Sequence, residues 1–502
     1  MIASALPDRI RRVFRADSMN AEFAMLRRFR MLLLAAAAFC ATCAAQAQAQ
    51  TQTQDLRTQA QEDQLHPSVP QTSVGKLLPK AVREVGGLRP WLYDFGITFA
   101  LNYQQDLLGA TTGGVRRGTT YMGRLEGVVE WDLEKAFGWK GGLFHVGAYQ
   151  IHGMGLSRHF LQTIQPVSDL EGLATTRLNE IWLEQKLGDQ VSVRIGQLAA
   201  DAEFFLTPFH ALPVGGAYGW PAIMAANLPN GGPAYPFATP GVRLRYDASQ
   251  DILLRAAVYN GDPVGPNCIG DPQKCNRNGI NFRIRDPAFA IAEGEVGYAL
   301  PYLGGLQGHT RVGAWANFGR FPDRRYDVFG APLAAPVSVG LPLQHRGDRG
   351  VYATFDQQIW RPSEKADDAG TGVFVYGRIA SAPSDRNQVN FYFDGGVSFI
   401  GLVPGRPNDQ FGFMGAYARI APSVRGNDVD VNLYSPALGP IHDFEALLQA
   451  TYQIQVTPGW SLQPNIQYVI HPNGHVVDPT DPLGQRAVRN ALVLGVRSSL
   501  KF

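Results

Sequence analysis

The residues best suited to bind a ligand lie in and beside one long segment, residues 199–238. This segment carries the carboxylates Asp201 and Glu203 and the indole of Trp220, with further aromatic rings among prolines and glycines. Aromatic rings stack on apolar C–H faces, and carboxylates and guanidinium groups form paired hydrogen bonds with adjacent hydroxyls. The segment therefore predicts a site for a sugar or polyol. The alternative is an outward-facing loop whose aromatic side chains pack only among themselves.

The flanking segments have the two-residue period of β-strands. From Phe95 to Gln104, bulky apolar side chains alternate with small or polar ones, and the same alternation runs through residues 444–456. A turn at residues 457–459 leads into a partner of the same pattern, which predicts a hairpin. One apolar face and one small or polar face suit a strand between lipid and a watery lumen.

The last residues repeat this pattern up to a final aromatic side chain. Leu492, Leu494, Val496, Leu500 and Phe502 alternate with Val493, Gly495, Arg497, Ser499 and Lys501. A strand of this kind at the end of the chain predicts the closing strand of a barrel. The edge strand of a soluble sheet is the alternative, and the rest of the chain argues against it.

The period recurs in about sixteen segments. They are predicted to begin near residues 95, 123, 141, 178, 190, 239, 252, 291, 309, 350, 371, 390, 410, 442, 460 and 488. Short connections, at 134–140, 188–189, 247–251, 301–308, 361–370, 403–409 and 457–459, alternate with mostly long ones, at 104–122, 152–177, 199–238, 261–290, 319–349, 421–441 and 471–487, and one brief exception, 381–389. Short periplasmic turns and long outer loops are typical of an even-stranded outer-membrane barrel.

Sixteen strands enclose an aqueous channel, whereas eight leave an interior that side chains fill. We therefore predict an all-β fold, a 16-stranded antiparallel transmembrane barrel with 199–238 as an inserted constriction loop. The alternation of side chains along each strand then predicts which of them face the lumen. The candidates for pore lining or substrate binding are Arg124, Glu126, Glu180, Arg194, Asp201, Glu203, Trp220, Arg243, Arg245 and Asp394, with Trp182 and Arg378 on the same side.

Six of these, Arg194, Asp201, Glu203, Trp220, Arg243 and Arg245, are the strongest candidates for contact with a ligand. They lie in the long segment or on the strands beside it. Each charged residue has an alternative role as a member of an ion pair that holds the wall of the barrel. Affinity is expected to be weak, because a conduit must release what it binds.

The N-terminus predicts export. Arg27, Arg28 and Arg30 precede the short apolar run 31–39, and AAQAQA at 44–49 offers cleavage sites. We read residues 1–47 as a signal peptide, with Met25 as an alternative start, and residues 48–87 as a flexible periplasmic extension ahead of a barrel at 88–502. The predicted location is the outer membrane of a Gram-negative bacterium, with its lipids as partners.

Composition and motifs narrow the function further. The net charge is +2 in 502 residues with 55 Gly and 34 Pro, which gives no support to nucleic-acid binding. No cofactor is predicted, and the chain carries no lipase elbow, zinc-protease helix or phosphate-binding loop. His145, His152 and His159 recur every seven residues, but odd spacing on a strand places neighbours on opposite faces, so a metal string is disfavoured.

The mature region contains one predicted cross-link. Cys268 and Cys275 lie close together in the segment 266–281, PNCIGDPQKCNRNGIN. In an oxidising compartment this pair predicts a small disulfide hairpin. A zinc site would require two further soft ligands, which this segment does not supply.

Many short motifs, in order from about residue 88 to 502, resemble the carbohydrate-selective porins of the OprB family. They are YGWP (218–221), LPNGGPAYP (228–236), PGVR (240–243), NGDP (260–263), APSDRN (382–387), DGG (394–396), GLVPGR (401–406), WSLQP (460–464) and QYVIHP (467–472). The resemblance implies facilitated diffusion of monosaccharides or polyols such as glucose through a sixteen-stranded barrel. Gln197 departs from the family pattern, in which we expect a lysine.

Three classes of function remain in order of preference. A passive sugar porin comes first, with a general diffusion porin as its nearest variant. A barrel enzyme would need a nucleophile and histidine on its outer wall, and no convincing set is present, so no enzymatic activity is predicted. A structural barrel that anchors the envelope is third. A homotrimer and a monomer both stay open, because lipid-facing and subunit-facing strands look alike in one sequence.

Overall fold

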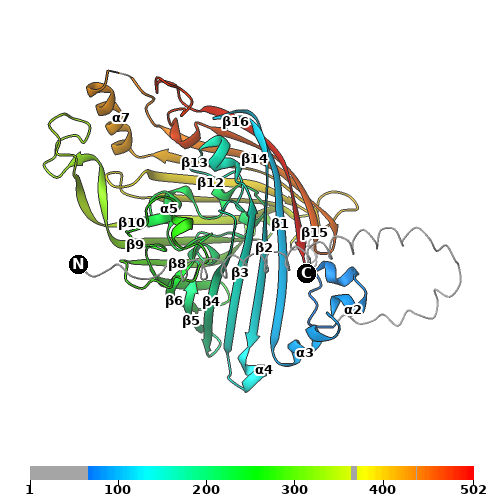
Figure 1. Ribbon diagram of the computed structural model, residues 1–502. Coiled ribbons are helices and arrows are strands. Elements are labelled where there is room, and N and C mark those ends of the chain that lie inside the picture. Colours follow the sequence, from blue (N-terminus) through cyan, green and yellow to red (C-terminus); the bar gives the residue numbers. More distant parts are fainter. Residues whose placement is uncertain (1–65, 363–369, 437) are drawn as a thin grey trace, which may run out of the picture. The chain divides into compact units, whose positions relative to one another are not determined.

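The strands pair into one closed antiparallel sheet. The computed structural model describes residues 66–362, 370–436 and 438–502. In these residues sixteen strands follow one another around a barrel, each hydrogen-bonded to its neighbours in sequence (Figure 1). The predicted 16-stranded antiparallel barrel is therefore confirmed. The predicted signal peptide, 1–47, and residues 48–65 of the predicted extension lie outside the described residues.

The strands vary in length from eight residues in β5 to 22 in β9. They are β1 (Ile97–Gly114), β2 (Gly118–Asp132), β3 (Gly142–Gly153), β4 (Thr175–Leu187), β5 (Val191–Leu198), β6 (Thr239–Asp247), β7 (Ile252–Asn260), β8 (Ala288–Leu300), β9 (Leu306–Asp327), β10 (Pro342–Trp360), β11 (Gly372–Ser381), β12 (Val389–Ile400), β13 (Gln410–Ile420), β14 (Phe444–Thr457), β15 (Trp460–Ile470) and β16 (Arg489–Lys501).

Helices occupy the connections and the residues before β1. The α-helices are α2 (Lys80–Arg83), α3 (Leu88–Asp94), α4 (Leu133–Phe137), α5 (Ala222–Ala225), α6 (Pro272–Cys275) and α7 (Pro422–Tyr434). Turns of other helix types are η1 (Val74–Leu77), η2 (Ser157–Leu161), η3 (Ala200–Ala202), η4 (Pro208–Ala211), η5 (Gly216–Tyr218), η6 (Pro229–Gly231), η7 (Pro301–Leu303) and η9 (Pro472–Gly474). Among the described helices, none has both the length and the apolar character to cross a membrane.

The first and last strands close the barrel. β1 pairs with β16 in a register that places Tyr103 opposite Leu500 and Asp106 opposite Arg497. Closure leaves no row of unpaired backbone groups, which a strand edge in hydrocarbon would present at a cost of several kcal/mol per group. The prediction made from the final residues of the chain is confirmed.

The two faces of each strand differ as the sequence predicted. In β16, Leu494 is 44% exposed on the outer face, whereas its neighbour Val493 is fully buried on the inner face. Arg497, which the sequence placed on the inner side, is only 4% exposed. Outward apolar side chains and inward polar ones are the arrangement of a membrane barrel.

Two of the predicted long loops are wrong in part. β2 begins at Gly118 and β10 at Pro342, rather than near 123 and 350, so only residues 115–117 join β1 to β2. The first residues of β2 pair with an extension of β1, as Gly118 does with Ala110, and those of β10 pair with an extension of β9. An apolar outer face is what locates a strand in the sequence. Where a strand extends beyond that face, its backbone hydrogen bonds continue although the apolar pattern ends.

Residues 66–94 lie at the end of the barrel that carries the short turns. The guanidinium of Arg89 donates to the carbonyl of Ser68 at 3.0 Å and lies 4.3 Å above the ring of Phe99 in β1. A Cβ atom on Gly459, in the turn between β14 and β15, would come within 2.2 Å of the backbone nitrogen of Val74. This part of the chain therefore contacts the rim of the barrel.

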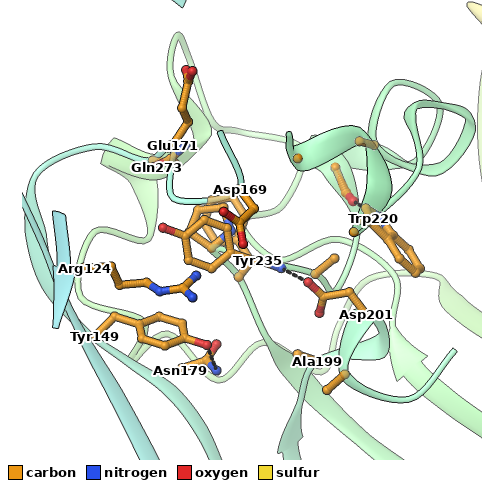
Figure 2. A pocket seen from close by; sticks show the side chains of 18 of the residues that line it. Arg124, Tyr149, Asp169, Glu171, Asn179, Ala199, Asp201, Trp220, Tyr235 and Gln273 are labelled. Carbon is orange, nitrogen blue, oxygen red and sulfur yellow. Dashed lines mark hydrogen bonds between the residues drawn. The ribbon is translucent and has the colours of Figure 1, made fainter. Parts of the chain in front are cut away.

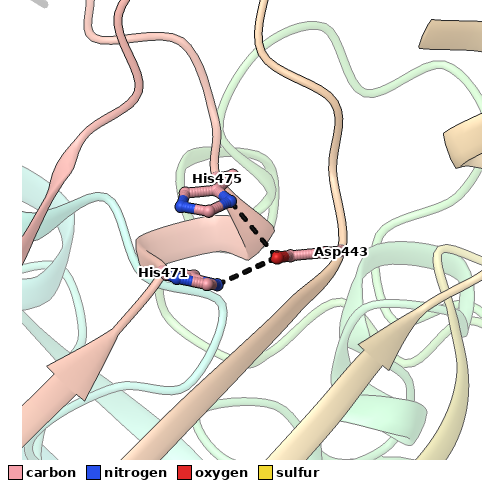
Figure 3. Close-up of side chains that lie close together, drawn as sticks. All are labelled: Asp443, His471 and His475. Atoms are coloured by element: carbon pink, nitrogen blue, oxygen red, sulfur yellow. Dashed lines mark hydrogen bonds and ion pairs between the residues drawn. The ribbon is translucent and has the colours of Figure 1, made fainter. Parts of the chain in front are cut away.

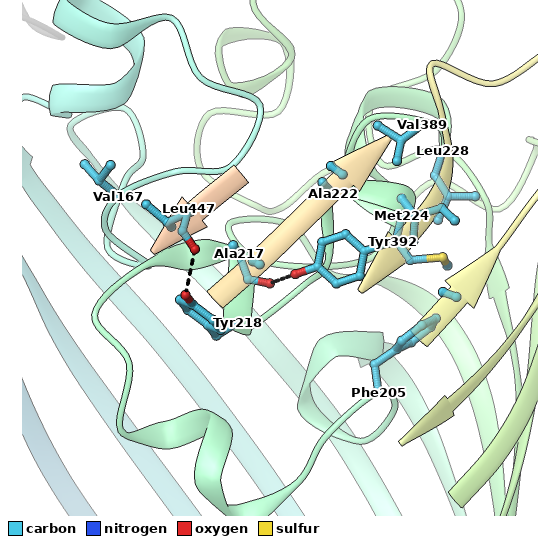
Figure 4. Packing of buried hydrophobic residues seen from close by; sticks show 14 of the residues in the cluster. Val167, Phe205, Ala217, Tyr218, Ala222, Met224, Leu228, Val389, Tyr392 and Leu447 are labelled. Carbon is cyan, nitrogen blue, oxygen red and sulfur yellow. Dashed lines mark hydrogen bonds between the residues drawn. The ribbon is translucent and has the colours of Figure 1, made fainter. Parts of the chain in front are cut away.

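Segment 199–238, which joins β5 to β6, packs against inward-facing side chains from distant strands. Figure 4 shows Tyr218, Met224 and Leu228 of the segment among side chains of the barrel wall. The hydroxyl of Tyr218 donates to the carbonyl of Leu447 in β14 at 3.2 Å. These apolar groups are nearly inaccessible to water, so the segment and the wall of the barrel share one buried apolar cluster.

Candidate functional site

A network of opposite charges begins on β4, β5 and β6. Arg194 and Arg243 lie opposite one another on β5 and β6, and Arg194 lies opposite Glu184 on β4. Arg194 donates to Glu184 at 2.6 Å and to Glu203 at 2.7 Å, and Arg243 contacts Glu203 at 2.8 Å and Glu184 at 3.3 Å. Two arginines from the wall thus hold one carboxylate from segment 199–238. The ring of Trp182 lies 3.7 Å below the guanidinium of Arg194.

The network continues along the next strands. Arg255 of β7 donates to the main-chain carbonyl of Glu203 at 2.7 Å and to Glu293 of β8 at 2.6 Å. Glu295, also on β8, bridges Arg255 and Arg311 of β9, at 3.1 and 2.9 Å. Sequence reasoning did not single out these four residues. Their positions on the inward faces of predicted strands could have identified them as lumen-facing residues. Which charges pair, however, depends on the register between strands.

A second group of buried ions fixes segment 199–238 from the opposite wall. Arg378 of β11 donates to Asp394 of β12 at 2.7 and 2.5 Å, and both side chains are fully buried. The same guanidinium donates to the carbonyls of Phe205 (2.9 Å), Gly219 (2.8 Å) and Ala217 (3.0 Å). One arginine therefore satisfies three carbonyls of the segment and one carboxylate of the wall.

His210 completes this anchor. The N–H of Thr207 donates to Nδ1 of His210 at 3.0 Å, so Nδ1 is the acceptor and the protonated Nε2 donates to Asp394 at 3.0 Å. Burial, together with the charge of Arg378, lowers the pKa of His210. The neutral ring therefore joins the segment to the same carboxylate that pairs with Arg378.

Phe205 shows how tightly the segment is held. Its φ angle is 66°, in the left-handed region that bulky residues rarely adopt. Its ring is fully buried and stacks on Tyr352 with centroids 3.7 Å apart, and it meets the ring of Trp220 edge-on at 5.6 Å. Backbone strain of this kind persists only where the surroundings over-determine the conformation.

A cavity of about 540 Å³ lies between the wall at β2–β4 and segment 199–238 (Figure 2). Arg124 extends into it from β2 between two tyrosine rings, 5.0 Å from the centroid of Tyr149 and 4.9 Å from that of Tyr235. Trp220 faces the cavity from the far side, with its indole N–H bound to the carbonyl of Gly231 at 3.0 Å. Aromatic faces and a guanidinium thus meet around one space.

Carboxylates complete the lining. Asp201 accepts from the N–H of Tyr235 at 2.9 Å, and Glu180 of β4 accepts from the N–H of Ala199 at 2.9 Å. Burial raises the pKa of Asp201 to about 7, and the charge of Glu180 contributes to the rise. Burial likewise raises the pKa of Glu171, at the rim, to about 7. The protonation of this lining therefore changes near neutral pH.

The ten predicted site residues fall into four groups. Arg124, Glu126, Glu180, Asp201 and Trp220 line the cavity. Arg194, Glu203 and Arg243 belong to the charged network. Asp394 is buried beneath the segment, and Arg245 pairs with Asp247 at 2.8 Å near the β6–β7 turn. The part that each plays toward a ligand stays a prediction.

Gln197 and the pair Cys268 and Cys275 also have defined partners. Gln197 is 2% exposed, and its amide donates to the carbonyls of Asn179 (3.0 Å) and Gly279 (2.9 Å). It therefore ties the β7–β8 connection to β4. In the same connection Cys268 and Cys275 form a disulfide, with their Cα atoms 5.9 Å apart.

The groups around the cavity are of the kinds that can bind hydroxyl groups. Rings offer flat apolar faces, and charged groups at fixed positions offer donors and acceptors for vicinal hydroxyls. A barrel with such a lining can hold a polar solute briefly while it passes. The fold and the site together point to a transport channel rather than an enzyme.

Comparisons with known proteins also indicate a channel. The family model described as the carbohydrate-selective porin, OprB family, matches residues 116–502. Porin B of Pseudomonas aeruginosa is 25% identical over 438 residues, which are 83% of this chain and 90% of that protein. A structure of OprB from Pseudomonas putida at high pH superposes with a TM-score of 0.72 at 21% identity, over 84% of this chain and 97% of that one.

The family match covers most of the chain, and the structural likeness supports the same fold. Porin relatives and a closed barrel with an apolar outer face indicate an outer-membrane protein of a Gram-negative bacterium. The chain belongs to the OprB family of carbohydrate-selective porins.

Proposed function

We propose that this porin admits monosaccharides or related polyols, such as glucose, by facilitated diffusion. The observation that carries the proposal is the cavity beside segment 199–238, where Arg124 lies between Tyr149 and Tyr235 and faces Asp201 and Trp220. Its volume of about 540 Å³ lies within the range of small-molecule sites. A sugar ring would stack on the aromatic faces while its hydroxyls bond to the charged groups.

The charged network has a supporting part in this proposal. Arg194 and Arg243 hold Glu203, and through it the start of segment 199–238, against the wall. The segment then keeps Asp201 and Trp220 at a fixed distance from Arg124. Each hydrogen bond to the sugar replaces one to water, so its net contribution is only about 1 kcal/mol, and a few of them give the weak affinity that a conduit needs.

Planar bilayer recordings test the proposal. The purified chain is reconstituted, and single-channel current in salt is recorded while glucose, mannitol or a disaccharide is added. We expect saturable block by a monosaccharide or polyol. In Trp220→Ala and Arg124→Ala the half-blocking concentration should rise about tenfold, the effect of losing roughly 1.4 kcal/mol.

Arg486→Ala is the matched control, because Arg486 is an exposed loop arginine whose carboxylate partner, Asp481, is 3.5 Å away. Its block should equal that of the unmodified chain. Open channels that are indifferent to all three solutes would indicate a general diffusion pore. If the folded protein formed no channels, the transport function itself would be refuted.

A further inference from the structure

The cavity beside segment 199–238 carries an excess of negative charge. Arg124 is the only arginine or lysine among the described residues that line it. Six carboxylates share the lining: Glu126, Asp169, Glu171, Glu180, Asp201 and Asp271. Figure 2 shows Asp169, Asp201 and the guanidinium of Arg124 around one space. The lining therefore differs from the charged network on β4, β5 and β6, where two arginines meet two carboxylates.

Four of these carboxylates accept hydrogen bonds from uncharged donors and form no ion pair with another described residue. Asp201 and Glu180 each accept from a backbone N–H at 2.9 Å, and Glu171 accepts from another at 3.0 Å. Glu126 accepts from the side-chain amide of Asn102 at 3.2 Å. An N–H group satisfies one lone pair and leaves the charge in place, so these carboxylates can also accept from a ligand.

The cations near the cavity do not cancel this excess. Asp169 pairs with Arg497, and Asp271 pairs with Arg158. Arg177 of β4 is buried and does not line the cavity. Two arginines thus neutralise two of the six carboxylates, and Arg124 and Arg177 are outnumbered by the other four.

The lining also offers more acceptors than donors. The side-chain amide of Asn179, which is 7% exposed, donates to the hydroxyl of Tyr149 at 2.9 Å, whereas its Oδ1 has no hydrogen-bond partner among the described residues. The indole N–H of Trp220 already donates to the carbonyl of Gly231. A hydroxyl group donates one hydrogen and an ammonium group donates three, but a carboxylate donates none. A ligand that brings donors therefore matches the lining, and one that brings a carboxylate does not.

A second cavity, of about 450 Å³, shares Glu171 with the first. Asn473 lines it and belongs to the turn between His471 and His475. Both imidazoles lie against Oδ2 of Asp443, at 3.0 and 3.3 Å, with their rings stacked (Figure 3). A carboxylate accompanies the two histidines, so this turn does not supply the cation that the first cavity lacks.

We propose that the cavity beside segment 199–238 selects protonated amino sugars and amino polyols over neutral ones, and that it disfavours sugar acids. The ammonium group would bond to carboxylates such as Asp201, while the carbon skeleton stacks on the aromatic faces. Charge-assisted hydrogen bonds are roughly twice as strong as neutral ones. This inference rests on the proposed function, because it assigns a charge preference to the same sugar site.

Three polyols that share a carbon skeleton and differ at one end test the proposal. Glucamine ends in an ammonium group, sorbitol in a hydroxyl and gluconate in a carboxylate. Their half-blocking concentrations are measured on single channels of the full chain in salt of about 0.1 M, where the Debye length is about 10 Å, and extrapolated to zero voltage to remove the effect of the applied field.

The recordings are made at about pH 8, where an alkylammonium group is still charged. Burial raises the pKa of Asp201 and of Glu171 to about 7, so both are mostly ionised at that pH. We expect glucamine to block at about one-tenth of the half-blocking concentration of sorbitol, and gluconate to need about ten times that concentration.

Two variants locate the preference. Asp201→Asn and Glu126→Gln keep the shape of the side chain and remove its charge. Each should lower the ratio of glucamine affinity to sorbitol affinity by about threefold, part of the tenfold preference. Asp189→Asn is the matched control, because Asp189 is an exposed carboxylate in the turn between β4 and β5, and its ratio should equal that of the unmodified chain.

The outcomes separate this inference from the proposed function. Block by sorbitol with equal or tighter block by gluconate than by glucamine would overturn the charge preference alone, whereas no block by any of the three would refute both. An unchanged ratio in both cavity variants, or an equal loss in Asp189→Asn, would overturn the assignment to this cavity.

Heat-modifiable electrophoretic mobility shows whether each variant has folded. If the cavity variants do not fold, the unmodified chain decides through its salt dependence. In salt of about 1 M the Debye length falls to about 3 Å, so the preference for glucamine should shrink. A preference that does not change with salt would refute an origin in the charges of the cavity.

Discussion

Replacing Arg378 with methionine should release segment 199–238 from the wall of the barrel. The substitution keeps much of the side-chain volume but removes every donor. Asp394 then remains buried without its cation, and the carbonyls of Phe205, Ala217 and Gly219 lose their shared partner. The carbonyls of Phe205 and Ala217 are buried and cannot recover a bond with water unless the segment moves, whereas that of Gly219 is only partly buried.

The magnitude follows from the burial of the pair. Breaking a fully buried ion pair by removing one partner costs about 3–5 kcal/mol, because an uncompensated charge stays behind. At about 1.4 kcal/mol per tenfold, the equilibrium between the seated and the released segment shifts by roughly 10²- to 10⁴-fold. We therefore expect larger and noisier single-channel currents, and a free energy of unfolding in lipid vesicles that is lower by a few kcal/mol.

Arg325→Met is the control, because Arg325 forms a similar two-point pair with Asp430 but is 31% exposed. A pair of this exposure contributes only about 0–1 kcal/mol. The double variant Arg378→Met with Asp394→Leu should recover part of the loss, since no charge is then left unpaired. Currents and unfolding free energy in Arg378→Met equal to those of the control would refute this account of the anchor.

Three further predictions concern protonation, closure and a loop contact. Because burial raises the pKa of Asp201 from its ordinary 3.8 to about 7, protonation favours the folded state, and the stability present below about pH 4 is lost as pH rises through 7. Cation selectivity from reversal potentials should rise with a midpoint near pH 7, and Asp201→Asn should reduce this step, with the remainder expected from Glu171, whose pKa burial also raises to about 7. Gly113→Ala would place Cβ 1.7 Å from the carbonyl oxygen of Asn490 on β16. The midpoint of urea unfolding should therefore lie at a lower urea concentration than in Gly138→Ala, where φ is also positive but Cβ would meet open space. Equal midpoints would contradict this prediction. Gln197→Met leaves two buried carbonyls unpaired and should lower the unfolding free energy by about 1–3 kcal/mol, whereas an unchanged value would mean that water replaces the amide.

The inward side of each strand was predictable, but what covers it was not. Asp394 was predicted as a pore-lining candidate from its parity. In the structure its carboxylate faces inward but lies beneath segment 199–238, paired with Arg378 and His210. The backbone of a strand decides locally which face a side chain lies on. What covers that face depends on where a distant segment packs.

The charged network shows the same division. Arg194, Arg243 and Glu203 were predicted together, because they lie within or beside one long segment. Arg255 and Arg311 were missed, because their partners come from the register of β7, β8 and β9. A register is decided by pairing along whole strands, so single residues give little sign of it.

The sequence by itself determined the class of fold and the family. Alternation, the terminal aromatic strand and the contrast of short and long connections follow from each strand having one face toward lipid and one toward water. These signals are repeated many times and each is local. Only the tertiary structure decided which ions pair, where segment 199–238 lies, and that Asp443, His471 and His475 meet. Such contacts join residues far apart in the chain, and they form because a closed barrel brings its walls and connections around one interior.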